Sequence, residues 1–340
     1  MKKLRVVVVT HDNENDVAES LGSLVSQTGI DMDLFVVDSG STDHTVDEVR
    51  SFFPRARILE MGHNIGFAGG CNQGLIQPLP EIVAFVNPDT WSDTEWLARA
   101  VADLDSNSKA GSIQPRIMLR DSRTKLNSRG NEANILFFGW PEGYGEECPD
   151  PGAVRRISFP SGCAVLFRRE VLETTKGFDP VYFMYGEDLD LGIRSFLLGW
   201  DVLYSPRATI YHKYQYRESA FKFFLLERNR LLTMLKVYRV RTIVLMFPLL
   251  LASELAIIVK AIKEKWFGEK LRSYGSVLVH VGYLRRARKE VQSTRVRSDS
   301  ELILLLKGAV KFEPLTKSST IAIGNIILKK YRSYLLGMRL

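Results

Sequence analysis

Short apolar runs alternate with helix-spaced segments over the first 90 residues of the chain. The apolar runs are Leu4–Val9, Leu34–Val37, Ala56–Leu59 and Ile82–Val86. The segments between them, with apolar residues at helical spacing, are Val17–Gln27, Thr45–Phe53 and Phe67–Ile76. Continuous apolar runs are typical of strands buried on both faces, and strands that alternate with helices form parallel sheets. The pattern predicts an α/β fold, with helices on both faces of a mostly parallel sheet.

Polar residues gather where these predicted strands end. The loops that follow the four strands are Thr10–Asn13, Asp38–Asp43, Asn64–Asn72 and Asn87–Asp89. Right-handed crossovers place the carboxyl ends of such strands at one edge of the sheet, where α/β folds bind ligands. A nucleotide-binding cleft at this edge is therefore expected, although surface loops are polar in most proteins.

The run Ile82–Val86 ends abruptly at Asn87-Pro88, because proline donates no ladder hydrogen bond and restricts the residue before it. Asp89 then lies at the carboxyl end of a buried strand, where it can bind a ligand. A simple turn, with Asp93 capping the next helix, fits the same residues.

Glycines mark the third loop, at Gly66, Gly69 and Gly70. They allow the backbone to approach a ligand, and the helix that starts there has free amides for phosphate. The segment is neither a GxGxxG fingerprint after the first strand nor a P-loop ending in GK[ST]. A glycine-rich tight turn remains an equal interpretation.

The middle of the chain contains a long segment, 121–150, rich in Asn, Gly, Glu and Pro. It predicts a loop that serves as a lid or acceptor-binding flap, or a plain surface excursion. Two short strands are expected further on, at Trp200–Tyr204 and Ala208–Tyr211, with His212 at the end of the second. A histidine there is either structural or a metal ligand.

Three acids, Glu187, Asp188 and Asp190, open a predicted helix whose apolar face contains Leu189 and Ile193. Carboxylates in a first turn are favoured by the helix dipole, which is a purely structural explanation. Asp188 follows an aromatic run, and in that position it is well placed to accept a proton.

Taken together, seven segments resemble glycosyltransferase family 2, of the inverting GT-A type. Within the family they are most similar to the branch of rhamnosyl- and galactofuranosyltransferases. The segments, which span about residues 4–235, are VVVVTHDN, VVDSGSTD, NIGFAGGCNQG, VNPD, PSGCAVLFRRE, GFDPVYFMYGEDLDLGIR and the strand end at His212. Each is weak alone, but their order over this length is specific.

The resemblance implies a role for each matching residue. The residues implied to bind the donor nucleotide are Thr10, Asn13, Asp38, Asn64, Gly66, Asn72 and Asn87. Asp89 matches the last acid of the metal-binding DxD motif, and His212 matches a residue that completes the metal site. Asn87 replaces the first acid of that motif, so one anionic ligand is lost. Asp188 matches the catalytic base, and the residues expected on the acceptor side are Ser161, Gly162, Glu187 and Asp190.

The implied chemistry suits these residue types. A divalent cation, Mg²⁺ or Mn²⁺, prefers oxygen ligands and offsets charge on a departing nucleoside diphosphate. A single carboxylate base leads to inversion at the anomeric carbon. The expected activity is sugar transfer from a nucleotide sugar, with dTDP-rhamnose as the best candidate, to a hydroxyl of a cell-surface glycan or lipid-linked acceptor.

The C-terminal third changes character. We expect a glycosyltransferase domain over residues 1–238 and a helical, membrane-associating extension over residues 239–340. The segment Ile243–Val259 is 17 residues long, contains Pro248 and Glu254, and has basic residues on both sides. It fits a helix lying on the membrane, a span, or a soluble core or dimer helix. Two apolar helices of unknown packing are expected at Leu302–Val310 and Ile321–Leu328.

Composition narrows the function classes. The chain has 340 residues, 45% hydrophobic content and a net charge of +7, which fits a globular protein with anionic partners. Its three cysteines form no CxxC pair, so zinc and redox motifs find no support. No signal peptide is recognised, and we expect the protein at the cytoplasmic face of the cell membrane, or otherwise in the cytoplasm.

Other functions fit less well. A non-catalytic glycan- or nucleotide-binding module at the membrane is the main alternative, and a sugar-phosphate nucleotidylyltransferase is a weaker one because the first loop lacks its Gly- and Arg-rich sequence. Nucleic-acid binding is not expected, because the basic residues cluster beside apolar helices rather than along one face with stacking aromatics.

Overall fold

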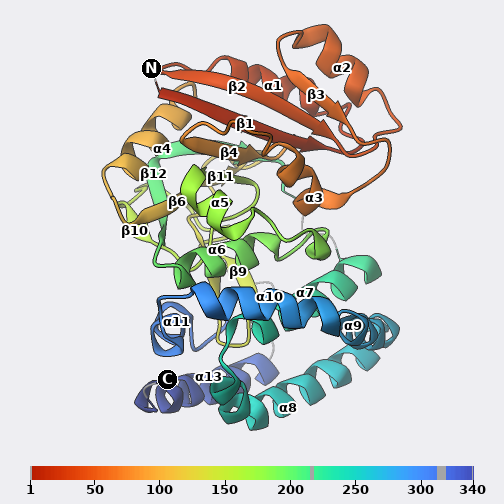
Figure 1. Cartoon of the computed structure of the whole chain (residues 1–340), viewed down its shortest axis with the longest axis vertical. Coiled ribbons are helices and arrows are strands. Elements are labelled where there is room, and N and C mark those ends of the chain that lie inside the picture. Colours follow the sequence, from red (N-terminus) through yellow and green to blue (C-terminus); the bar gives the residue numbers. More distant parts are fainter. Residues whose placement is uncertain (1, 215–217, 312–318, 339) are drawn as a thin grey trace. The chain divides into compact units, whose positions relative to one another are not determined.

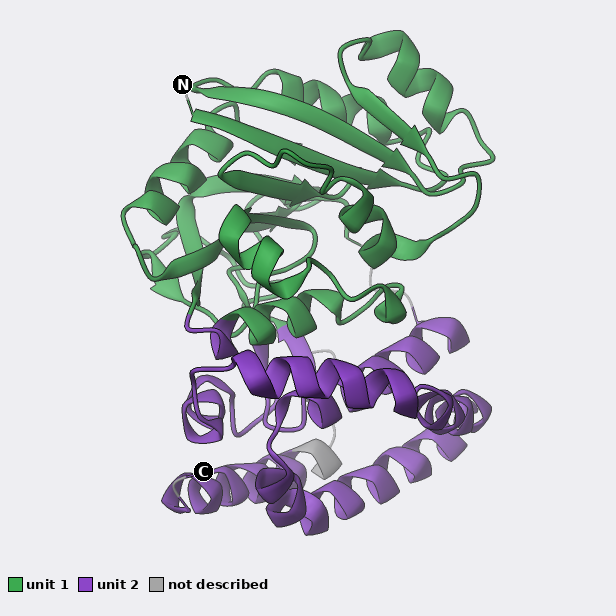
Figure 2. Ribbon diagram, viewed as in Figure 1, with its two compact units in different colours: residues 1–131, 141–195, 200–215 green, residues 132–140, 196–199, 216–340 purple. Residues whose placement is uncertain are grey.

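The computed structural model describes residues 2–214, 218–311, 319–338 and 340. The chain separates into two compact units (Figure 2). Unit 1 comprises residues 1–131, 141–195 and 200–215, and unit 2 comprises residues 132–140, 196–199 and 216–340. Each unit is described by itself below.

Unit 1 is built on a ten-stranded mixed sheet (Figure 1). Its main path runs β10-β12-β6-β11-β4-β1-β2-β3, with β5 paired to β12 and β7 paired to β6. The strands are β1 Lys2–Thr10, β2 Ile30–Asp38, β3 Arg57–Glu60, β4 Ile82–Val86, β5 Thr90–Ser92, β6 Ala110–Leu119, β7 Leu126–Ser128, β10 Arg155–Arg156, β11 Ala164–Arg168 and β12 Asp201–His212. A separate two-stranded sheet joins β8 Asn131–Ala133 to β9 Gly139–Pro141.

The first four predicted strands are present and parallel, so the predicted α/β fold is confirmed. Strand β11 runs antiparallel between β4 and β6, and β12 runs parallel to β6. The helices of this part are α1 Val17–Val25, α2 Thr45–Phe52, α3 Gly66–Gln73, α4 Trp96–Asp105, α5 Arg169–Thr175, the 3-10 helix η1 Pro180–Tyr182 and α6 Glu187–Leu197.

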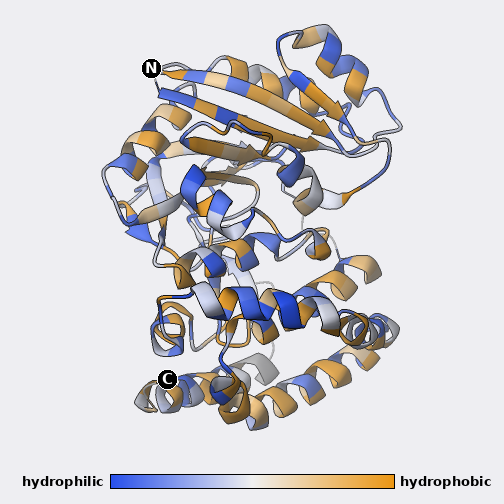
Figure 3. Ribbon diagram, viewed as in Figure 1, coloured by the Kyte–Doolittle hydropathy of each residue, from blue (hydrophilic) through white to orange (hydrophobic). Residues whose placement is uncertain are grey.

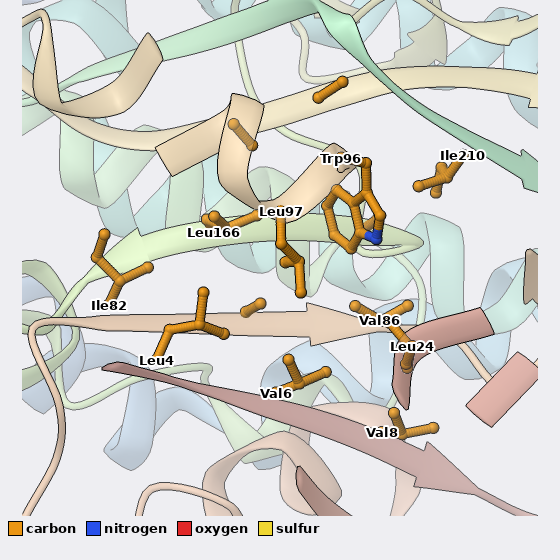
Figure 4. Packing of buried hydrophobic residues seen from close by; sticks show 14 of the residues in the cluster. Leu4, Val6, Val8, Leu24, Ile82, Val86, Trp96, Leu97, Leu166 and Ile210 are labelled. Atoms are coloured by element: carbon orange, nitrogen blue, oxygen red, sulfur yellow. The ribbon is translucent and has the colours of Figure 1, made fainter. Parts of the chain in front are cut away.

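Apolar side chains fill both faces of the sheet. On one face, Trp96 and Leu97 of α4 and Leu24 of α1 pack on strand residues such as Ile82 and Leu166 (Figure 4). On the other face, three phenylalanines, Phe85, Phe167 and Phe178, make edge-to-face contacts. Two-sided burial explains why the central strands are continuously apolar in sequence.

Two sequence expectations are corrected in unit 1. Residues 201–212 form one strand, β12, rather than two, because β6 holds both ends in register across an irregularity between Ser205 and Thr209. The segment 121–150 is not a structureless loop, because it contains β7, the antiparallel partner of β6, and the whole of the small β8-β9 sheet. Each of these strands is three residues long, too short for a periodic pattern to reveal it.

Unit 2 is mainly helical. Its helices are α7 Ala220–Val237, α8 Val240–Lys263, α9 Phe267–Val279, α10 Val281–Thr294, α11 Asp299–Leu305 and α13 Ser319–Gly337. We expected residues up to 238 to belong to the catalytic domain, but α7 packs on α9 and α10 and falls in unit 2. Within the described residues, α8 is the one helix long and apolar enough to cross a membrane, and 17% of its most apolar window is buried.

Candidate active site

The carboxyl ends of β1 and β2 place Thr10 beside Asp38, which are register partners. Asp38 is buried, and its carboxylate accepts hydrogen bonds from Thr10 Oγ1 (3.0 Å) and from the backbone N–H of Gly40 (3.1 Å) and Ser41 (3.0 Å). The carboxylate thereby shapes the loop after β2. Two residues predicted to bind the donor therefore lie side by side at the expected edge.

The loop after β3 is tied to the loop after β2 through side chains. Asn64 Oδ1 accepts hydrogen bonds from Ser39 Oγ (3.3 Å) and from the backbone N–H of Gly66 (2.9 Å). Ser39 Oγ in turn accepts from the backbone N–H of Ile65 at 2.9 Å. Asn64 and Gly66 thus join Thr10 and Asp38 in one network at the sheet edge.

Gly66 has a structural reason to be glycine. Its φ is +74°, and a Cβ there would lie 2.6 Å from the carbonyl oxygen of Phe183 and 2.5 Å from its ring. The same carbonyl accepts the backbone N–H of Ala68 at 3.0 Å. The start of α3 therefore packs directly on the segment that leads to the acids of α6.

Asp89 and His212 come together at the ends of β4 and β12. His212 Nε2 lies 3.3 Å from Asp89 Oδ1, and His212 Nδ1 lies 2.9 Å from Asn127 Oδ1. Strand β5 pairs with β12, and Thr90 is the register partner of His212. This pairing places His212 next to Asp89, the residue before Thr90. Burial lowers the pKa of His212, but Cys163 and Asp89 outweigh burial and raise it to about 10.

This pair fits a cation that takes nitrogen and oxygen ligands. Asp89 Oδ1 is buried and accepts no hydrogen bond of ordinary geometry among the described residues, and it faces Nε2. Because Asn127 Oδ1 can accept the proton on Nδ1, the Nε2 lone pair is available to a metal once its own proton leaves. Within the described ranges, no cluster of three or more His, Cys, Asp or Glu that could hold a metal ion is present, and Asp89 and His212 are two candidate ligands.

Asp188 lies at the start of α6 against the loop before β11. Its Oδ2 accepts the backbone N–H of Gly162 at 3.0 Å, and its Oδ1 accepts that of Leu189 at 2.7 Å. Burial raises the pKa of Asp188, although these backbone hydrogen bonds act in the opposite direction. A carboxylate with a raised pKa and some remaining exposure is suited to accept a proton.

Glu187 is more deeply buried than Asp188. Its Oε2 has no hydrogen-bond partner in the described part of the chain. Burial, followed by the charge of Asp188, holds the pKa of Glu187 well above its usual range. Burial of Glu187 beside Asp188 therefore disfavours a second negative charge at this place.

Asp190 has other contacts than its two acidic neighbours. Its carboxylate is fully buried, accepts a hydrogen bond from Tyr182 Oη at 3.1 Å, and pairs with Arg194 Nε at 2.7 Å. Arg194 also donates to the carbonyl oxygens of Thr175 and Gly177. Asp190, which we expected on the acceptor side, is thus used inside the protein to tie α6 to the turns before it.

The loop Ser161–Cys163 connects the acid and the metal pair. The N–H of Gly162 binds Asp188, and the thiol of Cys163 lies against the imidazole of His212. The carbonyl of Cys163 accepts the N–H of Asn87 at 2.8 Å. The consecutive residues Gly162 and Cys163 therefore contact Asp188, Asn87 and His212.

Two other predicted residues, Asn13 and Asn72, have local contacts. Asn13 Oδ1 accepts the N–H of His11 at 2.8 Å. Asn72 lies on α3, and its side-chain amide both donates to the carbonyl of Phe178 (2.7 Å) and accepts its N–H (2.9 Å). The Asn72 side chain therefore holds α3 to the turn before η1.

Sequence reasoning missed Asn127, Cys163 and Gln114. Gln114 is buried in β6, and its Oε1 accepts the N–H of Ser161 at 2.7 Å. Asn127 lies on β7, in the segment read as a loop, so no sequence pattern pointed to it. Cys163 belongs to the PSGC segment, but nothing in the sequence placed it beside a site residue, because it is one of three cysteines that are far apart in the chain.

Comparison with known proteins agrees with this geometry. The model of "Glycosyl transferase family 2" matches residues 5–175. An N-acetylglucosaminyl-diphospho-decaprenol L-rhamnosyltransferase of Mycobacterium tuberculosis is 30% identical over 233 residues, which cover 62% of this chain and 75% of that protein. A poly-beta-1,6-N-acetyl-D-glucosamine synthase of Staphylococcus epidermidis is 23% identical, over 59% of this chain and 48% of that protein.

Solved structures share the fold. GalNAc-T7 with UDP, GalNAc and Mn²⁺ superposes with a TM-score of 0.56 and 14% identity, over 71% of this chain and 48% of that one. S. aureus TarS 1-349 in complex with UDP superposes with a TM-score of 0.51 and 20% identity, over 99% and 92% of the two chains. The family match spans half of the chain and includes most of the sheet edge described above, so the chain belongs to glycosyl transferase family 2 and is a glycosyltransferase.

Proposed function

We propose that this glycosyltransferase moves a rhamnosyl group from dTDP-rhamnose to a hydroxyl of a lipid-linked acceptor, with inversion at the anomeric carbon. The observation that carries the proposal is the 30% identity to a rhamnosyltransferase over 233 residues, a stretch longer than the family match. The name of that relative describes an acceptor joined to a decaprenol lipid through a diphosphate. A lipid-linked acceptor also fits a protein working at the cytoplasmic face of the cell membrane.

Asp188 is the proposed base. It takes the proton from the acceptor hydroxyl as that oxygen forms a bond to the anomeric carbon. The bond from the anomeric carbon to the diphosphate breaks at the same time, and the nucleoside diphosphate leaves with the electron pair. The N–H of Gly162 keeps the Asp188 carboxylate oriented, and the raised pKa of Asp188 makes it a better proton acceptor.

Glu187 and the loop at Ser161 and Gly162 form the proposed acceptor side. Burial and the charge of Asp188 raise the pKa of Glu187, which favours its protonated form, and in that form it can donate a hydrogen bond to the acceptor. Thr10, Asn13, Asp38, Asn64, Gly66 and Asn87 surround the proposed donor nucleotide. In this proposal the donor binds at the sheet edge and the acceptor binds at the start of α6.

Asp89 and His212 are the proposed ligands of a divalent cation, Mg²⁺ or Mn²⁺. Structures of the same fold carry such an ion with nucleotides: GalNAc-T7 with UDP and Mn²⁺, and a mannosyltransferase of Pyrobaculum calidifontis with GDP-Man and Mn²⁺. When bound, the cation would offset the negative charge on the departing diphosphate. Asn87 offers a neutral oxygen at the position before Pro88.

A panel of donors tests the assignment. Thermal unfolding is followed with dTDP-rhamnose, UDP-galactofuranose, UDP-glucose, UDP-N-acetylglucosamine or GDP-mannose, with and without Mn²⁺. A donor at 100 times its dissociation constant stabilises the folded state by about 2.7 kcal/mol. We expect a metal-dependent shift with dTDP-rhamnose. A larger shift with another donor would replace rhamnose in the proposal.

The role of Asp188 is tested by substitution. Asp188→Asn is expected to bind the donor as the wild type does but to release nucleoside diphosphate about 10²–10⁴ times more slowly in the presence of acceptor. Asp121→Asn, an exposed aspartate outside the site, is the matched control and should retain full turnover. Full activity of Asp188→Asn would contradict its role as the base.

A further inference from the structure

Helix α8 exposes a continuous apolar face. Its exposed large apolar residues recur every three or four positions and are Val240, Val244, Phe247, Leu251, Leu255, Val259 and Ile262. Their exposed fractions range from 51% to 65%. From Val240 to Ile262 the stripe spans 22 residue steps and is about 33 Å long, and Figure 3 shows the helix as mostly apolar. A stripe of this length is an interaction surface rather than an ordinary surface in water.

The side of α8 that faces α7 and α9 carries a charged residue, Glu254. Glu254 accepts hydrogen bonds from Arg230 of α7 (2.5 Å) and from Lys270 (2.7 Å) and Tyr274 (2.6 Å) of α9. Glu227 of α7 also binds Arg230 at 2.8 Å and contacts Lys270. Lys270 and Arg230 are almost completely buried. A network of ion pairs therefore fastens the middle of α8 to α7 and α9.

The network remains charged at neutral pH. Burial raises the pKa of Glu254, but Arg230 and the hydrogen bonds from Lys270 and Tyr274 outweigh burial and lower it to about 2. To cross a bilayer as a separate span, α8 would have to expose Glu254 to hydrocarbon. Arg230 and Lys270 would then lose a buried counter-charge, and both changes are unfavourable. The contacts of Glu254 thus oppose a spanning orientation.

Basic side chains border the apolar stripe at both ends. Arg239 and Arg241 are exposed at the start of α8, and Lys260, Lys263 and Lys265 are exposed near its end. Helix α13 contacts α8 through Tyr331, whose hydroxyl donates to the carbonyl of Leu245 at 2.6 Å. It adds exposed apolar residues, Ile323, Ile326 and Ile327. An apolar stripe between clusters of basic residues complements the headgroups and upper acyl chains of an anionic membrane.

We propose that α8 lies flat in the interface of an anionic bilayer, with its apolar stripe in the lipid and its Glu254 side held on α7 and α9. The enzyme is then attached to one leaflet without crossing the membrane. This extends the proposed use of a lipid-linked acceptor, but attachment itself needs no donor, metal or turnover. A second copy of the chain is a poorer occupant, because pairing two α8 helices would bring like basic ends together.

Vesicle flotation tests the lipid surface. The full chain is mixed with vesicles of phosphatidylcholine alone or with one third phosphatidylglycerol. We expect binding to the anionic vesicles that weakens as salt is raised. The triple variant Phe247→Glu, Leu251→Glu, Leu255→Glu should bind at least tenfold more weakly. The matched control Val25→Glu, Phe52→Glu, Ile76→Glu places the same charges on exposed apolar residues of unit 1 and should bind like the wild type.

Depth measurements separate a flat helix from a span. Val244→Cys, Leu251→Cys and Val259→Cys are made one at a time with Cys148→Ser, because Cys71 and Cys163 are buried. Each carries a fluorophore that is quenched by lipids brominated at different depths. Equal, shallow depths at all three positions support the proposal, and a deep middle position with shallow ends would overturn it. Absence of vesicle binding by a chain that is dimeric in solution would also overturn it and would assign the stripe to a second copy.

Failure of this inference is distinguishable from failure of the proposed function. Donor-dependent thermal shifts are measured without vesicles, and flotation is measured without donor. A chain that binds dTDP-rhamnose but not anionic vesicles retains its proposed reaction and loses only its proposed attachment.

Discussion

At the scale of single residues, Asn127 decides how His212 presents its imidazole. Asn127 Oδ1 lies 2.9 Å from Nδ1, and the opposite nitrogen, Nε2, faces Asp89. A side chain that orients a histidine ligand is worth about 10- to 100-fold in metal affinity. Asn127→Leu is therefore expected to weaken Mn²⁺ binding by about that factor, measured as free Mn²⁺ by electron paramagnetic resonance in the presence of dTDP.

Asn127→Asp is the companion variant. It keeps an oxygen acceptor at the same place, so the imidazole stays oriented and Mn²⁺ affinity should be retained. Equal loss in both variants would mean that Asn127 acts by packing alone. The measurement needs no turnover, so it reports on the proposed metal site independently of the sugar.

Glu187 makes a prediction about stability and pH. The folded protein holds a proton on Glu187 at pH values where an unfolded glutamate has already released it. The free energy of unfolding should therefore fall as the pH rises from the ordinary glutamate pKa towards the raised one, by up to about 1.4 kcal/mol per pH unit. Glu187→Gln should lack this loss and be the more stable protein at the upper end of the interval.

Urea unfolding of both proteins at a series of pH values tests this directly. Parallel pH curves for the wild type and Glu187→Gln would show that Glu187 is ionised in the folded state, contrary to the expectation.

Where a strand end supplied the context, the sequence predicted the position of a residue, while the role of that residue stays a prediction. Asp89 and His212 both end or follow strands, and the structure brings them within 3.3 Å of each other. Asp190 and Asn72 matched the same family motifs, yet both are hydrogen-bonded inside the protein. A motif match cannot distinguish a polar side chain that faces a ligand from one that holds two elements together, because either role requires a particular residue type at that position.

At the scale of elements, the packing of α3 on the segment before α6 depends on Gly66. A methyl group at this position would clash with Phe183, and the positive φ is unfavourable for any residue with a Cβ. Gly66→Ala should lower the free energy of unfolding by more than about 1 kcal/mol, measured by urea denaturation. Gly62→Ala is a matched control: it has a similar φ of +70° but nothing within 4 Å, so it isolates the backbone cost from the clash.

The ion pair inside α6 gives a second element-scale prediction. Removing one partner of a buried pair leaves the other charge without compensation and costs about 3–5 kcal/mol. Asp190→Ala should therefore destabilise the protein by about this amount in urea denaturation. Tyr182→Phe removes the hydroxyl that donates to the Asp190 carboxylate and should cost about 1.5–3 kcal/mol, the range for a hydrogen bond to a charged group. A small effect of Asp190→Ala would mean that Arg194 is satisfied by its two carbonyl contacts.

Elements were predictable where one physical signal dominates. The strands β1, β2 and β4 are buried on both faces, so their apolar runs reveal them without any partner being known. Strand β7 is three residues long and is defined by pairing with β6, a contact that leaves no periodicity in the sequence. The predicted loop over 121–150 missed it for that reason, and Asn127 was missed with it.

At the scale of the whole molecule, every residue that we predicted for the site belongs to unit 1. Donor and Mn²⁺ should therefore protect amides of unit 1 from hydrogen exchange, above all in the loops after β1, β2 and β4. The amides of α8, α9 and α10 should exchange as before. Mass spectrometry with and without dTDP and Mn²⁺ measures this, and equal protection in both units would show that ligand binding also stabilises unit 2.

The division of the chain was predicted less well than its fold. Helix α7 carries apolar residues interleaved with Arg and Lys, a pattern that shows a buried face but not which element buries it. In the structure its partners are α9 and α10, which follow it in sequence. Hydropathy alone likewise allowed three interpretations of α8. Whether burying the charge of Glu254 is favourable depends on its contacts with Arg230 and Lys270, which hydropathy does not report.

The irregularity in β12 has a consequence for how this chain tolerates insertions and deletions. Ser205 opposes Pro115 and Thr209 opposes Arg116, so three residues of β12 lie between consecutive partners on β6. His212 is placed by the register of the last four residues with β6 and β5, downstream of these three. A residue gained or lost between Ser205 and Thr209 would change the size of the bulge and leave His212 where it is. A residue gained or lost after Thr209 would turn His212 to the opposite face of the sheet, so the two places should differ sharply in the length changes that an active enzyme accepts.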